Sequence, residues 1–495
     1  MIVIQTESLM GNTSASNGVT RRRFSGLVPF FLSVRFAGTG QEEPVAAGGG
    51  AIVLRPDPWP SAVTQIRYKS RVTGTLSAPS ASGKSDYKLE SQGDFEFLQQ
   101  VAALPPGSSG LWRAARSFSL AKTLTRVGGN HETLTTLPVG ASRIRLTSRD
   151  NLLTQFSPDV RLTRPQLDLL HFPVDPLAVA GLLPQRALST AAERWNADNR
   201  TAALLCGLDA VIEQTTVCSI ERITDQEAVI RFSCRASGAV TGSAAEVEVS
   251  GALTLDRASG VLRSLTATIL EKRSPGAISP GLDVKGDVEW SQEFSEDSKA
   301  GLPEPPAESE VDPRFLLLTL VTPWQLLLLH DRDWHVFQQT AELMVLRRVS
   351  NGALIAQCNL SRGPQQPPGQ YSSQEEFLAD VERRISERGG QIENSIVHAD
   401  INGWRIHHVR AMGKVPVDEP QGEKSRELPQ GAVPKGAKDR KVLWDYYLCS
   451  AQTGEQYSLV FSHLEEDSAS FGDVADQMLR TLTLRAPRPR VALPK

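Results

Sequence analysis

Alternation of apolar and polar residues with the two-residue period of a β-strand runs through long segments of this chain, and it limits the fold more than any other feature. Two such segments lie in the first hundred residues. Their alternating positions are Ile66, Tyr68, Ser70, Val72, Gly74 and Leu76 in the first, and Tyr87, Leu89, Ser91, Gly93, Phe95 and Phe97 in the second. The spacing predicts two neighbouring antiparallel strands joined by a loop at residues 78–85.

Residues 215–290 show the same pattern in long strands joined by short turns. One face carries Val247, Val249, Leu253 and Leu255, and the other carries Glu246, Glu248, Ser250 and Thr254. The turn "DRASG", residues 256–260, ends in a glycine that suits the left-handed position of a hairpin loop. We therefore predict an antiparallel meander with one apolar and one solvated face, which could curve into a half-barrel.

Residues 163–208 interrupt the strands with a helical pattern. Thr163, Asp175 and Asp198 are of the types that cap helices, and Pro165 and Pro176 suit first turns. Residues 57–295 are thus predicted to form an α+β domain, an antiparallel β-meander with helices that cover one side. This domain resembles the β-rich domains of exported bacterial proteins, some of which are half-barrels that shield lipids.

Five cysteines are too few for a disulfide scaffold, and none precedes Cys206. A turn centred on Gln226 would pair Cys218 with Cys234 and place both thiols on the apolar face. A disulfide between Cys218 and Cys234 is then one alternative in an oxidising compartment, and two buried free thiols are the other.

A second domain is predicted after the segment "EDSKAGLPEPPAESEVDP", residues 296–313, which is acidic, rich in proline and has little to bury. The apolar run from Phe315 to Leu329 is shorter than the roughly 20 residues that span a bilayer, and polar residues interrupt it. We interpret it as buried core and predict no transmembrane segment.

Hairpin and helix signals alternate in residues 314–485. Asn351-Gly352 and Asn402-Gly403 each predict a tight hairpin turn, and Ser373 with Glu376 forms a capping box at the start of an amphipathic helix. This order, with segments such as "NGWRIHHVRAMG" and "FGDVADQMLRTL", resembles the PsbP-like α/β/α sandwich family. The resemblance implies a binding scaffold rather than an enzyme. Residues 416–440 are predicted to be a disordered insertion, and residues 486–495 a tail.

The first 56 residues contain a basic stretch followed by an apolar one. "TRRRF", residues 20–24, resembles the twin-arginine signal of bacteria, in which Arg21, Arg22 and Phe24 would be recognition elements. We therefore predict a signal and flexible spacer in residues 1–56 and an exported protein, periplasmic or envelope-associated; a basic tail is the alternative. Amino-terminal sequencing of the native protein tests this, because an intact signal on a cytoplasmic species would contradict export.

The charge of the chain argues against a nucleic-acid partner. Lysine and arginine number 53, aspartate and glutamate number 56, and the net charge is −3. This balance lacks the positive field on which non-specific binding to nucleic acids depends.

No segment has a firm catalytic, cofactor or metal motif. Residues 78–85 satisfy a relaxed phosphate-loop pattern, but the strand-like residues that follow favour a hairpin. His330, Asp331, Asp333 and His335 form the densest group of potential metal ligands, yet their spacing matches no known site and a solvated turn before a strand is favoured. We therefore assign no catalytic residue, no cofactor and no metal.

These observations lead to three hypotheses. The first is a non-enzymatic binding or assembly protein of the bacterial cell envelope, with an unknown protein partner. The second is a lipid or hydrophobic-ligand carrier that uses the concave face of the N-terminal sheet. The third is a hydrolase with a dispersed site. An apolar cavity between residues 163–208 and the sheet would favour the carrier, whereas a filled core there would remove it.

Overall fold

The fold is described from a computed structural model in residues 51–54, 63–80, 83–102, 112–129, 131–149, 152–295, 301–306, 311–387, 389–416 and 439–485. The signal residues Arg21, Arg22 and Phe24 lie outside these ranges, as do nearly all of residues 416–440 and the tail. No helix within the described ranges is both long enough and apolar enough to cross a membrane.

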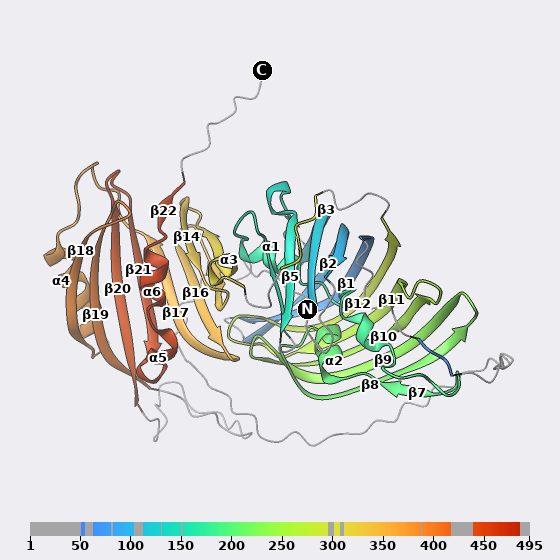
Figure 1. Cartoon of the computed structure of the whole chain (residues 1–495). Coiled ribbons are helices and arrows are strands. Elements are labelled where there is room, and N and C mark those ends of the chain that lie inside the picture. The colour runs from blue at the N-terminus through green and yellow to red at the C-terminus, as the bar shows by residue number, and fades with distance from the viewer. Residues whose placement is uncertain are drawn as a thin grey trace, which may run out of the picture.

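The N-terminal unit is built on one 12-stranded antiparallel sheet (Figure 1). Its strands are β1 (Thr64–Ser80), β2 (Gly83–Val101), β3 (Trp112–Val127), β4 (His131–Thr136), β5 (Arg143–Arg149), β6 (Leu152–Phe156), β7 (Arg194–Asn196), β8 (Ala210–Ile223), β9 (Glu227–Val240), β10 (Ser243–Asp256), β11 (Leu262–Arg273) and β12 (Gly281–Phe294). The order is β6-β5-β3-β2-β1-β12-β11-β10-β9-β8-β7, with β4 beside β3. Because β1 pairs with both β2 and β12, two meanders join along one seam into a single curved sheet.

The predicted alternation is confirmed in these strands. The inward positions Ile66, Tyr68, Val247 and Val249 are buried in one large apolar core, whereas Glu248 on the opposite face is exposed. The loop at residues 78–85 belongs to the β1–β2 hairpin, in which Ala78 lies opposite Ser85, so the hairpin interpretation is confirmed. The left-handed conformation of Gly260 at the β10–β11 turn also agrees with the sequence.

The segment between β6 and β8 packs on the inner face of the curved sheet. It contains α1 (Arg164–Leu169), a 3-10 turn (Val179–Leu182) and α2 (Asn199–Cys206). Thr163 caps α1 through a capping box, and the Asp198 side chain accepts a hydrogen bond from the Thr201 N–H at 2.8 Å. Apolar side chains of this segment share one core with the strands, so most of the concave side is filled: Leu162, Leu167, Leu170, Phe172, Leu177, Leu182, Leu205 and Leu208.

The C-terminal unit is built on a seven-stranded antiparallel sheet. Its strands, in the order β15-β16-β17-β21-β20-β19-β18, are β15 (Trp334–Gln339), β16 (Leu343–Ser350), β17 (Ala353–Arg362), β18 (Gln391–Ile401), β19 (Trp404–Pro416), β20 (Asp439–Ala451) and β21 (Gln456–Leu464). Helix α4 (Gln374–Ser386), with its predicted capping box of Ser373 and Glu376, covers one face. A three-stranded sheet of β13 (Leu318–Val321), β14 (Leu326–His330) and β22 (Thr483–Leu484) covers part of the other face, together with α5 (Ser468–Phe471) and α6 (Val474–Leu479).

The predicted fold class, α+β with a C-terminal α/β/α sandwich, is wrong. The described chain is mainly strand, in large antiparallel sheets, and α4 is the only described helix in the C-terminal unit longer than six residues. The apolar run Phe315–Leu329 is buried core in part, as predicted, and it contains strand β13 and most of β14. Leu326 and Leu328 are buried in the core of the C-terminal unit.

The two units meet at two tight turns. Gly242, in the β9–β10 turn, and Gly352, in the β16–β17 turn, both have positive φ, and a Cβ atom built on Gly242 would overlap the Gly352 carbonyl group. Only the absence of a side chain allows this approach. Gly403, in the turn between β18 and β19, has a similar φ of +80° but no neighbour within 4 Å of such an atom.

Replacing Gly242 by alanine is therefore expected to cost clearly more stability than replacing Gly403. Both variants pay the backbone cost of positive φ, about 1 kcal/mol. Gly242→Ala should pay roughly 1–3 kcal/mol in addition, because the two units must separate to admit the methyl group. Urea unfolding of both variants measures the difference; equal free energies of unfolding would contradict the contact between the turns.

Candidate functional site

A pocket of about 970 Å³ lies between the two units and is the candidate site. The N-terminal unit contributes residues of β6, α1, the end of α2 and the turns after β9 and β11, and the C-terminal unit contributes residues of β13, β14, β15 and the β16–β17 turn. Apolar side chains make up much of the wall: Leu153, Leu167, Phe172, Leu204, Leu208, Ile278, Leu282, Leu320, Val321, Val336 and Val349. Neither unit forms this pocket without the other.

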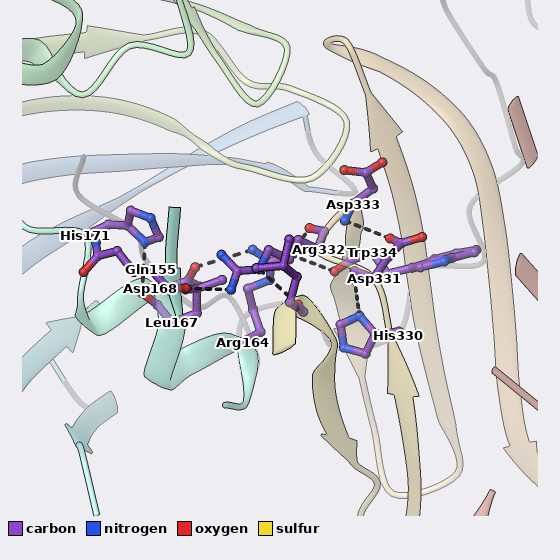
Figure 2. Close-up of polar contacts among 11 residues, drawn as sticks. Gln155, Arg164, Leu167, Asp168, His171, His330, Asp331, Arg332, Asp333 and Trp334 are labelled. Atoms are coloured by element: carbon purple, nitrogen blue, oxygen red, sulfur yellow. Dashed lines mark hydrogen bonds and ion pairs between the residues drawn. The ribbon is translucent and has the colours of Figure 1, made fainter. Parts of the chain in front are cut away.

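Two arginines hold the units together beside the pocket (Figure 2). Arg332, in the turn between β14 and β15, donates from Nε to the Leu316 carbonyl oxygen at 3.0 Å and from Nη2 to the Gln155 carbonyl oxygen at 2.6 Å. Arg164, from α1, donates in the opposite direction, to the carbonyl oxygens of Arg332 and, at 3.1 Å, of Trp334. The two guanidinium groups therefore cross the boundary in a reciprocal arrangement.

Arg332 differs from the other cations that line the pocket, because within the described residues no carboxylate lies within 4 Å of its guanidinium group. Arg164 is 3.7 Å from Asp168, and Arg273 forms an ion pair with Glu271. Burial, with a smaller contribution from Arg164, lowers the pKa of Arg332 to about 10, so the group is still charged at neutral pH. Within the described residues its hydrogen-bond acceptors are two backbone carbonyl oxygens.

Most carboxylates of the pocket are neutralised by the protein. Asp175 pairs with Arg116 at 2.5 Å, and Asp333 lies 3.6 Å from Arg348, which also lies 3.3 Å from Asp331. Asp209 accepts the Thr241 backbone N–H at 2.5 Å and is exposed to solvent. Arg348 is thus shared by two carboxylates, and among the described residues Arg332 is the cation of the pocket wall that has no carboxylate within 4 Å.

Three histidines lie around the same boundary and are held neutral. Burial lowers the pKa of His171 and of His330 to about 4, and that of His335 to about 2, the last with a contribution from nearby Arg164. His171 and His330 each place Nδ1 near a backbone carbonyl oxygen, of Leu167 at 2.9 Å and of Asp331 at 2.6 Å. No protein partner for the His335 ring occurs among the described residues, so its nitrogens are available to a ligand.

The pKa of Asp168 is shifted upward, in contrast to the pKa values of the histidines. Burial raises its pKa to about 6, although the neighbouring Arg164 opposes the change. A proton on Asp168 near pH 6 would reduce the negative charge at this end of the pocket.

Residues 331–333 form the predicted turn before β15, and the side chains of Asp331 and Asp333 are 34% and 45% exposed. His330, which precedes the turn, is only 3% exposed, and Arg332 in the turn contacts the N-terminal unit. Within the described residues there is no group of three or more histidine, cysteine, aspartate and glutamate side chains placed to hold a metal.

Sequence analysis did not identify Arg164, Asp168 and His171 as pocket residues. Helix α1 carries Arg164 and Asp168, and His171 lies two residues after its end. One signal was present. Arg164 is the first residue of α1, where the positive end of the helix dipole disfavours a cation. A cation in that position is more favourable when other groups hold it, as the carbonyl oxygens of the C-terminal unit do here.

The two cysteines of the predicted disulfide face the apolar core, as expected, but they do not lie opposite each other. Cys218 pairs with Phe232 and Cys234 with Thr216, because the β8–β9 hairpin begins earlier than expected and contains a bulge between Ile220 and Arg222. All five cysteines are free, and the nearest sulfur to Cys234 is that of Cys206, in α2, at 3.6 Å.

The hydrolase hypothesis gains no support from the pocket. Among its described lining residues, no serine or threonine hydroxyl is hydrogen-bonded to a histidine ring. A contact of this kind occurs elsewhere, between His463 and Ser468 at 3.2 Å, but that histidine is buried against Phe471 and lies outside the pocket.

Comparison with known proteins does not assign the chain to a family. No known family and no curated protein matches the sequence, so the PsbP-like resemblance stays a prediction. Among solved structures, a lipovitellin structure described by its lipid–protein interactions has 10% identity and a TM-score of 0.27, over 51% of this chain and 26% of that one. The chain thus spans about a quarter of the lipovitellin chain.

Two further structural matches have still lower TM-scores. The translocator domain of the autotransporter NalP from Neisseria meningitidis has 8% identity and a TM-score of 0.10, over 83% of this chain and 90% of that one. OccK5 (OpdH) from Pseudomonas aeruginosa has 9% identity and a TM-score of 0.11, over 81% and 98%. At these TM-scores none of the three similarities assigns a fold or a function, and the functional argument depends on the pocket itself.

Proposed function

We propose that this protein is a non-enzymatic binding protein that takes up a small hydrophobic or amphipathic ligand in the pocket between its two units. The observation that carries the proposal is the pocket of about 970 Å³, with its largely aliphatic wall. Ligand pockets in proteins commonly measure about 300–1,000 Å³ and combine apolar walls with a few polar groups. The pocket has this size and this composition.

The location of the proposed site differs from that of the predicted carrier. The concave face of the N-terminal sheet is packed by the segment between β6 and β8, which leaves the pocket at one end, where the C-terminal unit completes it. A ligand there would contact both units and would stabilise their docked arrangement by mass action. Export to the envelope and an unknown protein partner stay predictions from the sequence.

Obstruction of the pocket tests this proposal. Leu204, on α2, lines the pocket, whereas Leu270, on the outer face of β11, is 47% exposed. Leu204→Trp should weaken binding of the uncharged dye Nile red at least about tenfold by filling the cavity, and Leu270→Trp should leave it unchanged. Fluorescence titration of the full chain gives both affinities. Absence of Nile red binding, or equal binding by the two variants, would refute the proposal.

A further inference from the structure

We infer that the ligand of this pocket is an amphiphile with one acidic headgroup, of the long-chain carboxylate class, and that Arg332 and His335 receive the headgroup. This inference rests on the proposed function and adds the chemistry of the ligand. It follows from three features of the described pocket: a cation without a carboxylate partner, an imidazole ring without a protein partner beside it, and an apolar wall around them.

The cation of Arg332 is the first feature. A guanidinium group has five N–H donors, and the protein uses only two from Arg332, one to each of two carbonyl oxygens. Among the described residues no side-chain or backbone acceptor engages Nη1. Arg332 is half-buried, so an anion that enters the pocket can accept charge-assisted hydrogen bonds from its unused donors.

The second feature is the imidazole ring of His335 beside this cation. His335 lines the pocket with no protein partner among the described residues, whereas His330 donates its Nδ1–H to the Asp331 carbonyl oxygen. A neutral imidazole donates one hydrogen bond, so His335 can add a donor to a carboxylate held by Arg332 without adding a second charge. A headgroup with one negative charge matches this site better than one with two.

The apolar wall is the third feature and excludes a purely polar anion such as phosphate as the best ligand. Leu167 and Phe172 from the N-terminal unit, with Leu320 and Val336 from the other, line the same pocket as Arg332. An alkyl chain attached to the carboxylate would bury its surface against these side chains at about 25 cal/mol per Å². The ligand therefore needs both an acidic head and an apolar tail.

Three probes with the same twelve-carbon chain test the inference: dodecanoate, dodecanol and dodecyltrimethylammonium, each titrated below its micelle concentration into the full chain. Dodecanoate should bind about 10- to 100-fold more tightly than dodecanol, as expected for hydrogen bonds to a charged group, and the cation should bind least. Equal affinity for dodecanoate and dodecanol would overturn the inference and leave the proposed function intact. Binding of none of the three would overturn both.

Matched variants assign the preference to residues. Arg332→Met should reduce the preference for dodecanoate over dodecanol to less than about threefold, and His335→Gln should reduce it in part. Arg347→Met is the control, since Arg347 also donates across the boundary, to the Ala277 carbonyl oxygen, but does not line the pocket. An unchanged preference in Arg332→Met would overturn the assignment. If that variant does not fold, the comparison of the three probes on the unmodified chain still decides the inference.

Discussion

Replacing Arg116 by methionine is expected to destabilise the N-terminal unit by about 3–5 kcal/mol, because it leaves the Asp175 carboxylate buried without its cation. Arg116 points from β3 into the core and is fully buried. Its guanidinium group contacts both Asp175 oxygens, at 2.5 and 2.8 Å, and its Nε donates to Gln99 at 2.9 Å. The same group lies 5.2 Å from the centroid of the Phe172 ring. This contact joins the segment between β6 and β8 to the sheet.

An exposed ion pair of the same strand is the matched control. Arg126 and Glu132 also lie 2.5 Å apart, but each side chain is about half exposed, at 51% and 50%. Arg126→Met should cost far less stability than Arg116→Met, since solvent already screens that pair. Urea unfolding followed by tryptophan fluorescence gives both free energies. The double variant Arg116→Met with Asp175→Leu should recover stability relative to Arg116→Met, because no charge is left buried. A loss for Arg116→Met as small as that for Arg126→Met would show that the pair is not structural.

Acidification is the second large effect that we expect, and it should act at the boundary between the units. The folded-state pKa values of His171 and His330 are lowered to about 4 by burial, below their value in the unfolded chain. As the pH falls below about 6.5, the unfolded chain binds protons first, so stability is complete above that pH and is lost toward pH 4. Each of the two histidines should account for about 3 kcal/mol of the loss at pH 4.

Asp168 acts in the opposite direction and reduces the net loss of stability. Its folded-state pKa is raised to about 6, so the folded protein binds that proton more readily and gains about 2 kcal/mol by pH 4. The pKa of His335 is also lowered by burial, to about 2, which adds to the loss. The three histidines outweigh the single aspartate, and the free energy of unfolding should decrease by roughly 7 kcal/mol between pH 7.5 and pH 4.

Urea unfolding at pH 7.5, 6, 5 and 4 measures this dependence. In His330→Gln, which cannot take up the proton, the loss between pH 7.5 and pH 4 should be smaller by about 3 kcal/mol. A variant that loses as much stability as the unmodified chain would show that His330 does not contribute to the acid transition. Stability that rises as the pH falls from 6.5 to 4 would contradict the sign of the whole effect.

The sequence predicted the parts of the site that depend on neighbours in the chain. Thr163 marks the start of α1, and Asp198 marks the start of α2, because capping hydrogen bonds join residues only a few positions apart. The turn before Trp334 was also predicted. What was not predicted is the contact of that turn with the N-terminal unit, because it depends on Gln155, a residue far away in sequence.

By itself the sequence determined the strands, their inward faces and the hairpin turns, because side-chain alternation and turn chemistry are local properties of the backbone. Only the tertiary structure decided the strand register at Cys218 and Cys234, the pairing of Arg116 with Asp175 and the pocket at Arg332. A single bulge shifts a register, and a buried charge acquires its partner only when distant segments meet. The C-terminal sandwich was mispredicted because it came from a resemblance in the order of hairpins and helix signals, and local order does not fix how the layers pack.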